Sequence, residues 1–288
     1  MRHASRRRAA LLLAGSLALL VHAGSLHAQA EQDEDAYETE ESELAAKSQN
    51  PVADLISVPF QNNTIFGIGP FNRTANLLNI QPVIPVNLSS SVNLISRAIL
   101  PVVTAPDVTR PNGTTWGLGD LVYTAFFSPA KPGALIWGAG PVLQFPTGTS
   151  DATGSGKWGV GPSIVLLGMP GRTVLGVLVN NIWSYAGSSD RDDVNQMLIQ
   201  YFVNYNFSHG WFLTSAPIIT SNWELPSHAG WVVPFGIGAG RVFPIGRQPV
   251  NLNAHFYYNA VTPETEDGTR IGPEWSLRVV LQLLFPKG

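Results

Sequence analysis

The chain has 288 residues, with 20 acidic and 17 basic side chains and no cysteine. The lack of cysteine excludes disulfides, thiolate metal sites and cysteine nucleophiles. A formal net charge of −3 also argues against the basic surface that a nucleic-acid-binding protein needs.

Residues 1–30 have the three parts of a secretory signal peptide. Four arginines precede an apolar run from Ala9 to about Val21, and Ala28-Gln29-Ala30 matches a cleavage site. A transmembrane anchor is the alternative, but the run is short and ends in small residues. We predict cleavage after Ala30, which leaves 17 − 4 = 13 basic and 20 acidic residues, a net charge of −7.

Residues 31–50 form an acidic leader, in which "EQDEDAYETEESE" carries eight acids and almost no apolar side chain. Such composition predicts a disordered, solvated periplasmic segment. An acidic lid or a partner-binding tail is the functional alternative. The stretch "ESELAAKS" could add one or two helical turns.

From Pro51 onward, apolar or alternating runs of about ten residues are separated by Gly, Pro, Asn, Asp and Ser. Tilted strands of this length cross a bilayer, whereas strands in soluble sandwiches average about five or six residues. The twelve predicted strands are Ala53–Gln61, Leu77–Leu88, Val92–Val103, Gly119–Ser128, Leu135–Pro146, Trp158–Met169, Thr173–Tyr185, Val194–Phe207, Trp211–Trp223, Trp231–Phe243, Val250–Val261 and Trp275–Phe285.

The lengths of the connections support the same architecture. Segments after odd-numbered strands are long and segments after even-numbered strands are short, without exception by these boundaries. Outer-membrane barrels have short periplasmic turns and longer external loops. A secreted soluble β-sandwich, the alternative, has no reason for this sorting. Both termini are therefore predicted to lie in the periplasm.

Aromatic residues gather at the predicted strand ends, as in the two interfacial girdles of a membrane barrel. Six tryptophans fall towards the outer rim and two towards the inner rim, where the last strand also ends on Phe285. The predicted girdle residues are Trp116, Trp158, Trp183, Trp223, Trp231 and Trp275 outside, and Trp137, Trp211 and Phe285 inside.

The last strand, "WSLRVVLQLLF", alternates strictly, which predicts that its Leu and Val face meets lipid. Its terminal Phe285 is expected to be read by the barrel-assembly machinery. Such barrels usually end on the aromatic residue itself, whereas here Pro286-Lys287-Gly288 follow.

Polar residues on the opposite faces are predicted to line the lumen. They are mostly neutral amides, which favours either a narrow path for solutes or a network that fills a closed barrel. A buried Arg278 would need an acid or carbonyl groups, with Glu274 and Asp120 as candidate acids. The predicted lumen residues are Gln144, Gln196, Gln200, Asn204, Asn251, Asn253, His255, Asn259, Arg278 and Gln282.

Catalysis is the less favoured interpretation. His209 and His228 fall in predicted turns, and His255 has no compact Ser and Asn cluster in the sequence like that of an outer-membrane phospholipase. "GSGKW" and "GIGAGR" fail the phosphate-loop and dinucleotide patterns, and the acids of "SSDRDD" and "PETEDG" match no calcium loop. We therefore predict no catalytic residue, no metal site and no cofactor.

Several segments also resemble a known family: "NPVADLISVPFQNNT", "LLNIQPVIPV", "GSGKWGVGPS", "NNIWSYAGSSDRDDVNQMLIQYFVNYN", "GWFLTSAPIITSNWE" and "QPVNLNAHFYYNAV". The chain from about Asn50 to Pro286 is similar to a bacterial family of outer-membrane barrels labelled as a phenol meta-pathway degradation, transporter-like family. Some relatives carry the misapplied name neuromedin U. The resemblance implies a barrel and supplies no binding or catalytic residues.

Together these patterns predict an all-β, antiparallel up-and-down transmembrane barrel in the bacterial outer membrane, from residue 51 to 288. The favoured function is passive passage or uptake of small, weakly charged organic solutes, with aromatic ones among them. The alternatives are a lipid-modifying enzyme and a closed structural barrel. The expected partners are outer-membrane lipid, the assembly machinery and the solute, and not nucleic acid.

Overall fold

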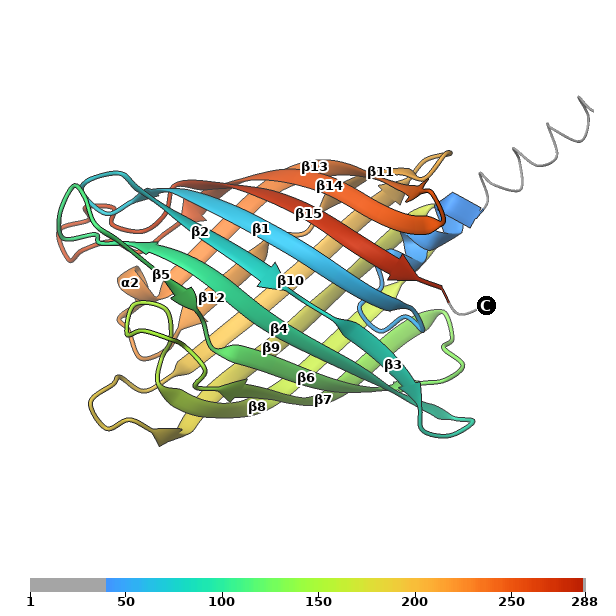
Figure 1. Cartoon of the computed structure of the whole chain (residues 1–288), viewed down its shortest axis with the longest axis horizontal. Helices are drawn as coiled ribbons and strands as arrows, with labels where there is room; N and C mark the ends of the chain where they lie inside the picture. The colour runs from blue at the N-terminus through green and yellow to red at the C-terminus, as the bar shows by residue number, and fades with distance from the viewer. Residues whose placement is uncertain (1–39, 287–288) are drawn as a thin grey trace, which may run out of the picture.

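The computed structural model describes residues 40–286, so the predicted signal peptide and residues 31–39 of the leader lie outside the described residues. The described chain forms one antiparallel sheet that closes on itself, with β15 paired to β1 and β10 paired to β9. Figure 1 shows the strands wound obliquely around a common axis. The predicted closed barrel is thus confirmed.

The sheet has fifteen strand segments. In chain order they are β1 (Ile56–Ile68), β2 (Arg73–Ile80), β3 (Val83–Asn87), β4 (Val92–Pro106), β5 (Thr114–Leu118), β6 (Leu121–Pro129), β7 (Leu135–Phe145), β8 (Lys157–Gly168), β9 (Thr173–Gly187), β10 (Asn195–Asn206), β11 (Trp211–Ser215), β12 (Ile218–Asn222), β13 (Trp231–Ile245), β14 (Gln248–Val261) and β15 (Trp275–Phe285). The described helices are residues 40–48 and the short α2 (Ser227–Gly230).

Fifteen segments make twelve barrel strands because three strands are each interrupted once, between β2 and β3, β5 and β6, and β11 and β12. Pro82 and Pro217 lie in two of these gaps. Proline has no N–H to donate to a strand ladder, so the pairing must break or bulge there.

Long connections lie at one end of the barrel and short ones at the other, with one exception. The segments 107–113, 146–156, 188–194, 223–230 and 262–274 lie at one end of the barrel, which we call the loop end. The shorter segments 88–91, 130–134, 169–172, 207–210 and 246–247 lie at the other, the turn end, together with Phe285 (Figure 1).

The exception is the first connection, which the sequence predicts to be long. The structure reduces it to residues 69–72, because β1 runs on to Ile68 and β2 begins at Arg73. Asn62, Asn63 and Asn76 are strand residues, and Asn62 and Asn76 exchange side-chain hydrogen bonds of 2.9 and 3.0 Å across the strand pair. Amide side chains can thus stabilise a pair of strands in a segment whose asparagine content suggests a turn.

The two faces of the strands differ as the alternation predicts. On β14, Asn253 and His255 are 8% and 6% exposed, whereas Leu252 and Phe256 are 44% and 51% exposed. On β15, Arg278 and Gln282 point inward, and Leu277, Val279 and Leu281 point outward. The outward apolar residues form the surface that would meet lipid.

The prediction that the acidic leader is disordered is wrong for residues 40–50, whereas the helical turns expected for "ESELAAKS" are present. Residues 40–48 are a helix at the turn end, drawn in blue in Figure 1. Leu44 and Ala45 are buried in a cluster with Phe212, Val242 and Leu284 of the barrel, and Ala46 packs against a second apolar cluster. Three apolar residues therefore dock a helix whose other side chains are mostly polar.

Among the described residues, no helix is long and apolar enough to cross a membrane.

The assignment of strand faces can be tested on β15. Leu281→Arg places a charge on the outward apolar face, and at mid-membrane such a charge costs ~2–4 kcal/mol. We therefore expect loss of heat-modifiable, folded barrel in detergent gels. Val280→Arg is the matched control, because Val280 lines the interior cavity beside it. Normal assembly of Leu281→Arg with failure of Val280→Arg would show that the faces are reversed.

Candidate functional site

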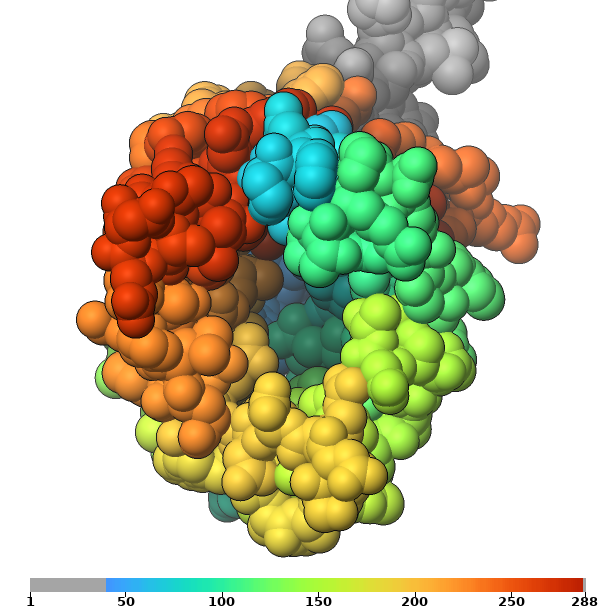
Figure 2. Space-filling model, turned by 90° about the vertical axis from the view of Figure 1, so that its left-hand side faces the viewer, coloured from blue at the N-terminus to red at the C-terminus, as the bar shows by residue number. Residues whose placement is uncertain are grey.

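The barrel interior contains two adjoining cavities of about 200 and 210 Å³. The turn-side cavity lies against residues 47–57, and the loop-side cavity extends from the middle of the barrel to Gln144 and Gln196. Figure 2 looks into the loop end and shows a hollow between the loops. Four polar residues line both cavities, and we call them the junction residues: Gln61, Gln81, Arg97 and Gln200.

Nine of the ten predicted lumen residues line these cavities. Gln144, Gln196 and Gln200 line the loop-side cavity, and Gln200 also lines the turn-side one. The tenth, Asn259, is buried nearer the loop end, where its side chain donates to Pro273 O at 2.9 Å. The other predicted residues, all in the turn-side cavity, are Asn204, Asn251, Asn253, His255, Arg278 and Gln282.

The inward residues of β14 form a continuous hydrogen-bonded ladder. Tyr257 OH lies 2.8 Å from His255 Nδ1, and His255 Nε2 lies 2.8 Å from Asn253 Oδ1. Asn253 Nδ2 donates to Asn251 Oδ1 at 3.0 Å. Because Tyr257 OH accepts from Ala216 N–H at 3.3 Å, its own proton is free for His255 Nδ1. This order gives a neutral imidazole that carries its proton on Nε2.

Arg278 is held at the break between β11 and β12. Its Nη1 donates to Ala216 O at 2.9 Å and its Nε donates to Asn63 Oδ1 at 2.8 Å. The guanidinium carbon also lies 4.9 Å from the Tyr257 ring centroid. Pro217, which cannot extend the ladder, leaves both polar backbone groups of Ala216 available to the interior.

The prediction that Glu274 or Asp120 could pair with Arg278 is therefore wrong, while its carbonyl alternative is met by Ala216. Asp120 accepts three hydrogen bonds at the loop end, from Gly148 N and from Ser155 N and Oγ. Glu274 packs against Gly67, also at the loop end. Glu274 and Asp120 were candidates because the sequence does not show how far along the barrel axis each residue lies from Arg278.

A second arginine lines the cavity and was not predicted to do so. Arg97 on β4 donates from Nη2 to Gln81 Oε1 at 2.5 Å, and Gln81 precedes the break at Pro82. The available signal was a lone charge in the apolar stretch Val92–Val103, since an ionisable residue in a membrane-spanning segment faces the interior. The neighbouring predicted strand, Leu77–Leu88, contains Pro82, and a proline inside a strand indicates a break in the ladder beside Arg97.

The opposite wall of the barrel is apolar. Ile95, Phe126, Val165, Leu178 and Phe202 are buried in one cluster that spans β4 to β10. Phe126 and Leu178 line the loop-side cavity, and Phe202 lines the turn-side one. The turn-side cavity thus has a polar wall on β14, β15 and β1, whereas the loop-side cavity is lined by apolar residues interleaved with polar ones such as Thr124, Gln144 and Asn180.

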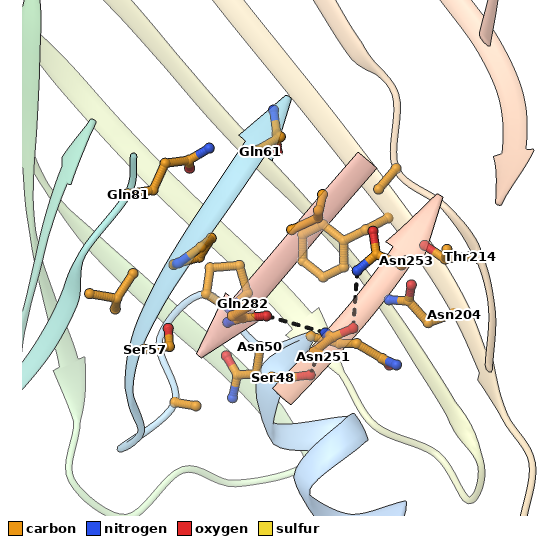
Figure 3. Close-up of a pocket in the computed structure, with 18 of the residues that line it drawn as sticks. Ser48, Asn50, Ser57, Gln61, Gln81, Asn204, Thr214, Asn251, Asn253 and Gln282 are labelled. Atoms are coloured by element: carbon orange, nitrogen blue, oxygen red, sulfur yellow. Dashed lines mark hydrogen bonds between the residues drawn. The ribbon is translucent and has the colours of Figure 1, made fainter. Parts of the chain in front are cut away.

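The N-terminal helix and the residues after it form the floor of the turn-side cavity. Asn251 Nδ2 donates to Ser48 Oγ at 3.0 Å and to Gln282 Oε1 at 3.2 Å, as Figure 3 shows. Gln49 and Asn206 exchange amide hydrogen bonds of 2.8 and 3.2 Å. Side-chain amides therefore tie the helix to the polar wall through Asn251 on β14, and tie Gln49 after the helix to Asn206 on β10.

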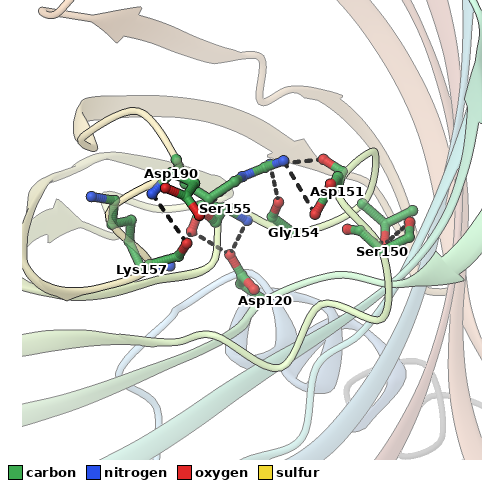
Figure 4. A network of polar contacts seen from close by, with 10 residues as sticks. Asp120, Ser150, Asp151, Gly154, Ser155, Lys157 and Asp190 are labelled. Atoms are coloured by element: carbon green, nitrogen blue, oxygen red, sulfur yellow. Dashed lines mark hydrogen bonds and ion pairs between the residues drawn. The ribbon is translucent and has the colours of Figure 1, made fainter.

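Hydrogen bonds and ion pairs of charged side chains connect the loops at the loop end (Figure 4). Arg191 Nη2 donates to Asp151 O and Gly154 O at 2.8 and 2.7 Å, and Gln144 Nε2 donates to Ser155 Oγ at 2.8 Å. Lys157 Nζ lies 2.9 Å from Asp193 Oδ1, and this ammonium holds the pKa of Asp193 below its usual range. In the described chain no group of three or more acids or histidines could hold a metal ion.

The predicted girdle residues lie at the two ends of the barrel. Trp137, Trp211 and Phe285 are near the turn end and are 44%, 51% and 40% exposed. The remaining tryptophans lie near the loop end, in or beside the ends of strands: Trp116, Trp158, Trp183, Trp223, Trp231 and Trp275.

The three described histidines lie at different heights in the barrel. His255 is bonded on both ring nitrogens, to Asn253 and Tyr257, and no serine hydroxyl of residues 40–286 is hydrogen-bonded to it. His209 lies in the turn 207–210, and His228 lies in α2 at the opposite end of the barrel.

No family model matches the chain, and no curated protein matches it in sequence. The resemblance to the phenol meta-pathway family therefore stays a prediction.

Solved structures match in fold. An outer-membrane channel from Pseudomonas putida F1 gives a TM-score of 0.60 at 17% identity, over 82% of this chain and 97% of that chain. The NanC porin gives 0.51 at 10% identity, over 79% and 98%. The outer membrane phospholipase A from Escherichia coli gives 0.44 at 13% identity, over 83% and 97%, a likeness too low to carry an argument. The chain thus has the fold of outer-membrane barrels and is similar in structure to channels.

Proposed function

We propose that the protein is an outer-membrane channel for passive passage of small, weakly charged organic solutes, with aromatic ones among them. The observation that carries the proposal is the pair of cavities that adjoin through the junction residues inside a closed barrel. The turn end, with the N-terminal helix, would face the periplasm and the loop end would face the outside.

Two alternatives are weaker. A lipid-modifying enzyme needs an activated nucleophile beside a base, and the imidazole of His255 is already bonded to an amide and a phenol. A closed structural barrel would need a filled interior, whereas this one has space along both cavities. The docked helix is the feature that most favours closure, so a test of the proposal must include it.

The proposal is tested first by wild-type behaviour. The protein should fractionate with outer membranes, migrate with heat-modifiable mobility and admit phenol-sized solutes into liposomes faster than into protein-free liposomes. Sugar-sized solutes should enter more slowly. Recovery as a soluble periplasmic species, or swelling no faster than that of empty liposomes, would contradict the proposal.

Narrowing the junction should slow entry. Gln200→Trp adds a bulky ring where the two cavities meet, and we expect slower swelling with preserved assembly. Val203→Trp is the matched control, because it adds the same ring on the outward face of the same strand, where Val203 is 46% exposed. If the interior were a filled network, Gln200→Trp would instead cost ~1–3 kcal/mol of stability and leave solute entry unchanged.

Undocking the helix should widen the turn end. Leu44→Asp removes a buried side chain, which alone costs ~2–5 kcal/mol, and it leaves a carboxylate among apolar residues, so the helix should leave its site. We expect larger single-channel conductance and faster sugar entry. Glu43→Gln is the control, because the Glu43 side chain is exposed. Unchanged conductance in a folded Leu44→Asp barrel would show that the helix does not restrict passage.

A further inference from the structure

The charge inside the barrel is of one sign. The described strands contain no Asp or Glu at all. Neither cavity is lined by a carboxylate, whereas Lys47, Arg97 and Arg278 line the turn-side cavity and Arg97 also lines the loop-side one. Lys47 belongs to the N-terminal helix and pairs with Glu43 at 2.9 Å. Of these three lining cations, Arg97 and Arg278 therefore have no opposing charge among the described residues.

The protein supplies these cations with neutral partners only. Arg278 donates to an amide oxygen and a backbone carbonyl, and Arg97 donates from its side chain to one amide oxygen. Neither forms an ion pair with a carboxylate of residues 40–286. A guanidinium has five N–H donors, so the donors left over, most of them on Arg97, are available to the cavity. Keeping a buried charge without a counter-charge is costly, which points to an anion as its intended partner.

The remaining charged residues of the strands do not share this position. Lys157 pairs with Asp193 at the loop end, and Arg241 lies 3.8 Å from Glu41 of the N-terminal helix. Arg73 donates to the backbone carbonyls of Arg110 and Gly113 in a loop. Among the described strand residues, only Arg97 and Arg278 thus combine a positive charge with a place in the cavities.

The apolar residues of the loop-side cavity limit what kind of anion fits. Leu178, Leu198 and Ile218 line the loop-side cavity opposite β1 and β4, and Arg97 lines the same cavity. A solute with a hydrocarbon or aromatic body could lie against these residues while its acid group meets the guanidinium. Planar carboxylates are well matched to the guanidinium fork.

We propose that the two adjoining cavities form a binding site for small organic monoanions with an apolar body, such as aromatic carboxylates, with Arg97 at the junction and Arg278 in the turn-side cavity as its anion-binding residues. This proposal rests on the proposed channel function and names its solute class. The positive interior repels cations and concentrates anions, and the apolar residues of the loop-side cavity discriminate among those anions.

The test uses the full-length protein in two assays. Reversal potentials in planar bilayers under a KCl gradient measure anion over cation permeability. Calorimetry in detergent measures binding of sodium benzoate, sodium acetate and benzyl alcohol. We expect a permeability ratio that favours chloride, and benzoate bound more tightly than either acetate or benzyl alcohol.

Substitutions then assign the effect to the two arginines. Arg97→Gln and Arg278→Gln should each weaken benzoate binding about tenfold or more, because a charge-assisted hydrogen bond is lost, and together they should bring the permeability ratio close to one. Arg97→Lys and Arg278→Lys should keep anion preference. Arg73→Gln removes a positive charge outside the cavities and should change neither. Heat-modifiable migration identifies any variant that fails to fold. Arg97→Gln loses one hydrogen-bond partner and Arg278→Gln loses two, so Arg97→Gln is expected to be the less destabilised variant.

The outcomes separate this proposal from the channel function. Entry of neutral solutes without any anion preference, or a preference that survives both Gln substitutions, would overturn the anion site and leave the channel standing. Arginine-dependent benzoate binding without any permeation would support the site and remove the channel. Tighter binding of acetate than of benzoate would overturn the apolar part of the assignment.

Discussion

The interior of this protein is governed by the closure of its sheet. Because β15 pairs with β1 from Phe285 to Trp275, the barrel has no edge strand with unpaired backbone groups. Each polar group inside must find a partner from another strand or from the cavity. The register sets those partners, and it places Asn63 directly opposite Arg278. The hydrogen-bonded ladder of β14 and the amide contacts of the helix are further consequences of the same constraint.

Two prolines interrupt the closed sheet next to the residues that hold the two interior arginines. At Pro82 and Pro217 the wall cannot complete its ladder, and the residue before each proline offers an oxygen to the interior. Gln81 meets Arg97 through its side chain, and Ala216 meets Arg278 through its backbone. Neutral oxygens orient a guanidinium without cancelling its charge. The breaks in the wall are therefore also the places where positive charge can be held in the lumen.

Much of the fold was readable from the sequence, because alternation on β10, β14 and β15 reports which face a residue occupies. The strand ends near Asn62 and Asn76 were not readable, since amides suit both turns and cross-strand pairs. Arg97 was missed because its strand is apolar on both faces and shows no period of two. Helical turns were expected in "ESELAAKS", but the docking of this helix on the barrel was missed. Leu44 and Ala45 bury against residues more than 160 positions away, and the composition of the segment alone is that of a solvated tail.

The N-terminal helix fills part of the turn-side cavity, whereas binding of a solute by the two arginines requires open space there. A solute path needs open space with polar donors exposed, whereas a docked helix at residues 40–48 fills one end and draws the amides Asn206 and Asn251 into its own contacts. These contacts are neutral hydrogen bonds, each worth about 0.5–1.5 kcal/mol net, together with a small apolar cluster. Such a floor can be firm enough to order the cavity. Within residues 40–50 it leaves both guanidinium groups without an acidic partner, because Glu41 pairs with Arg241 at the barrel wall and Glu43 pairs with Lys47. This division of partners keeps the described acids of the helix from neutralising the two arginines of the lumen.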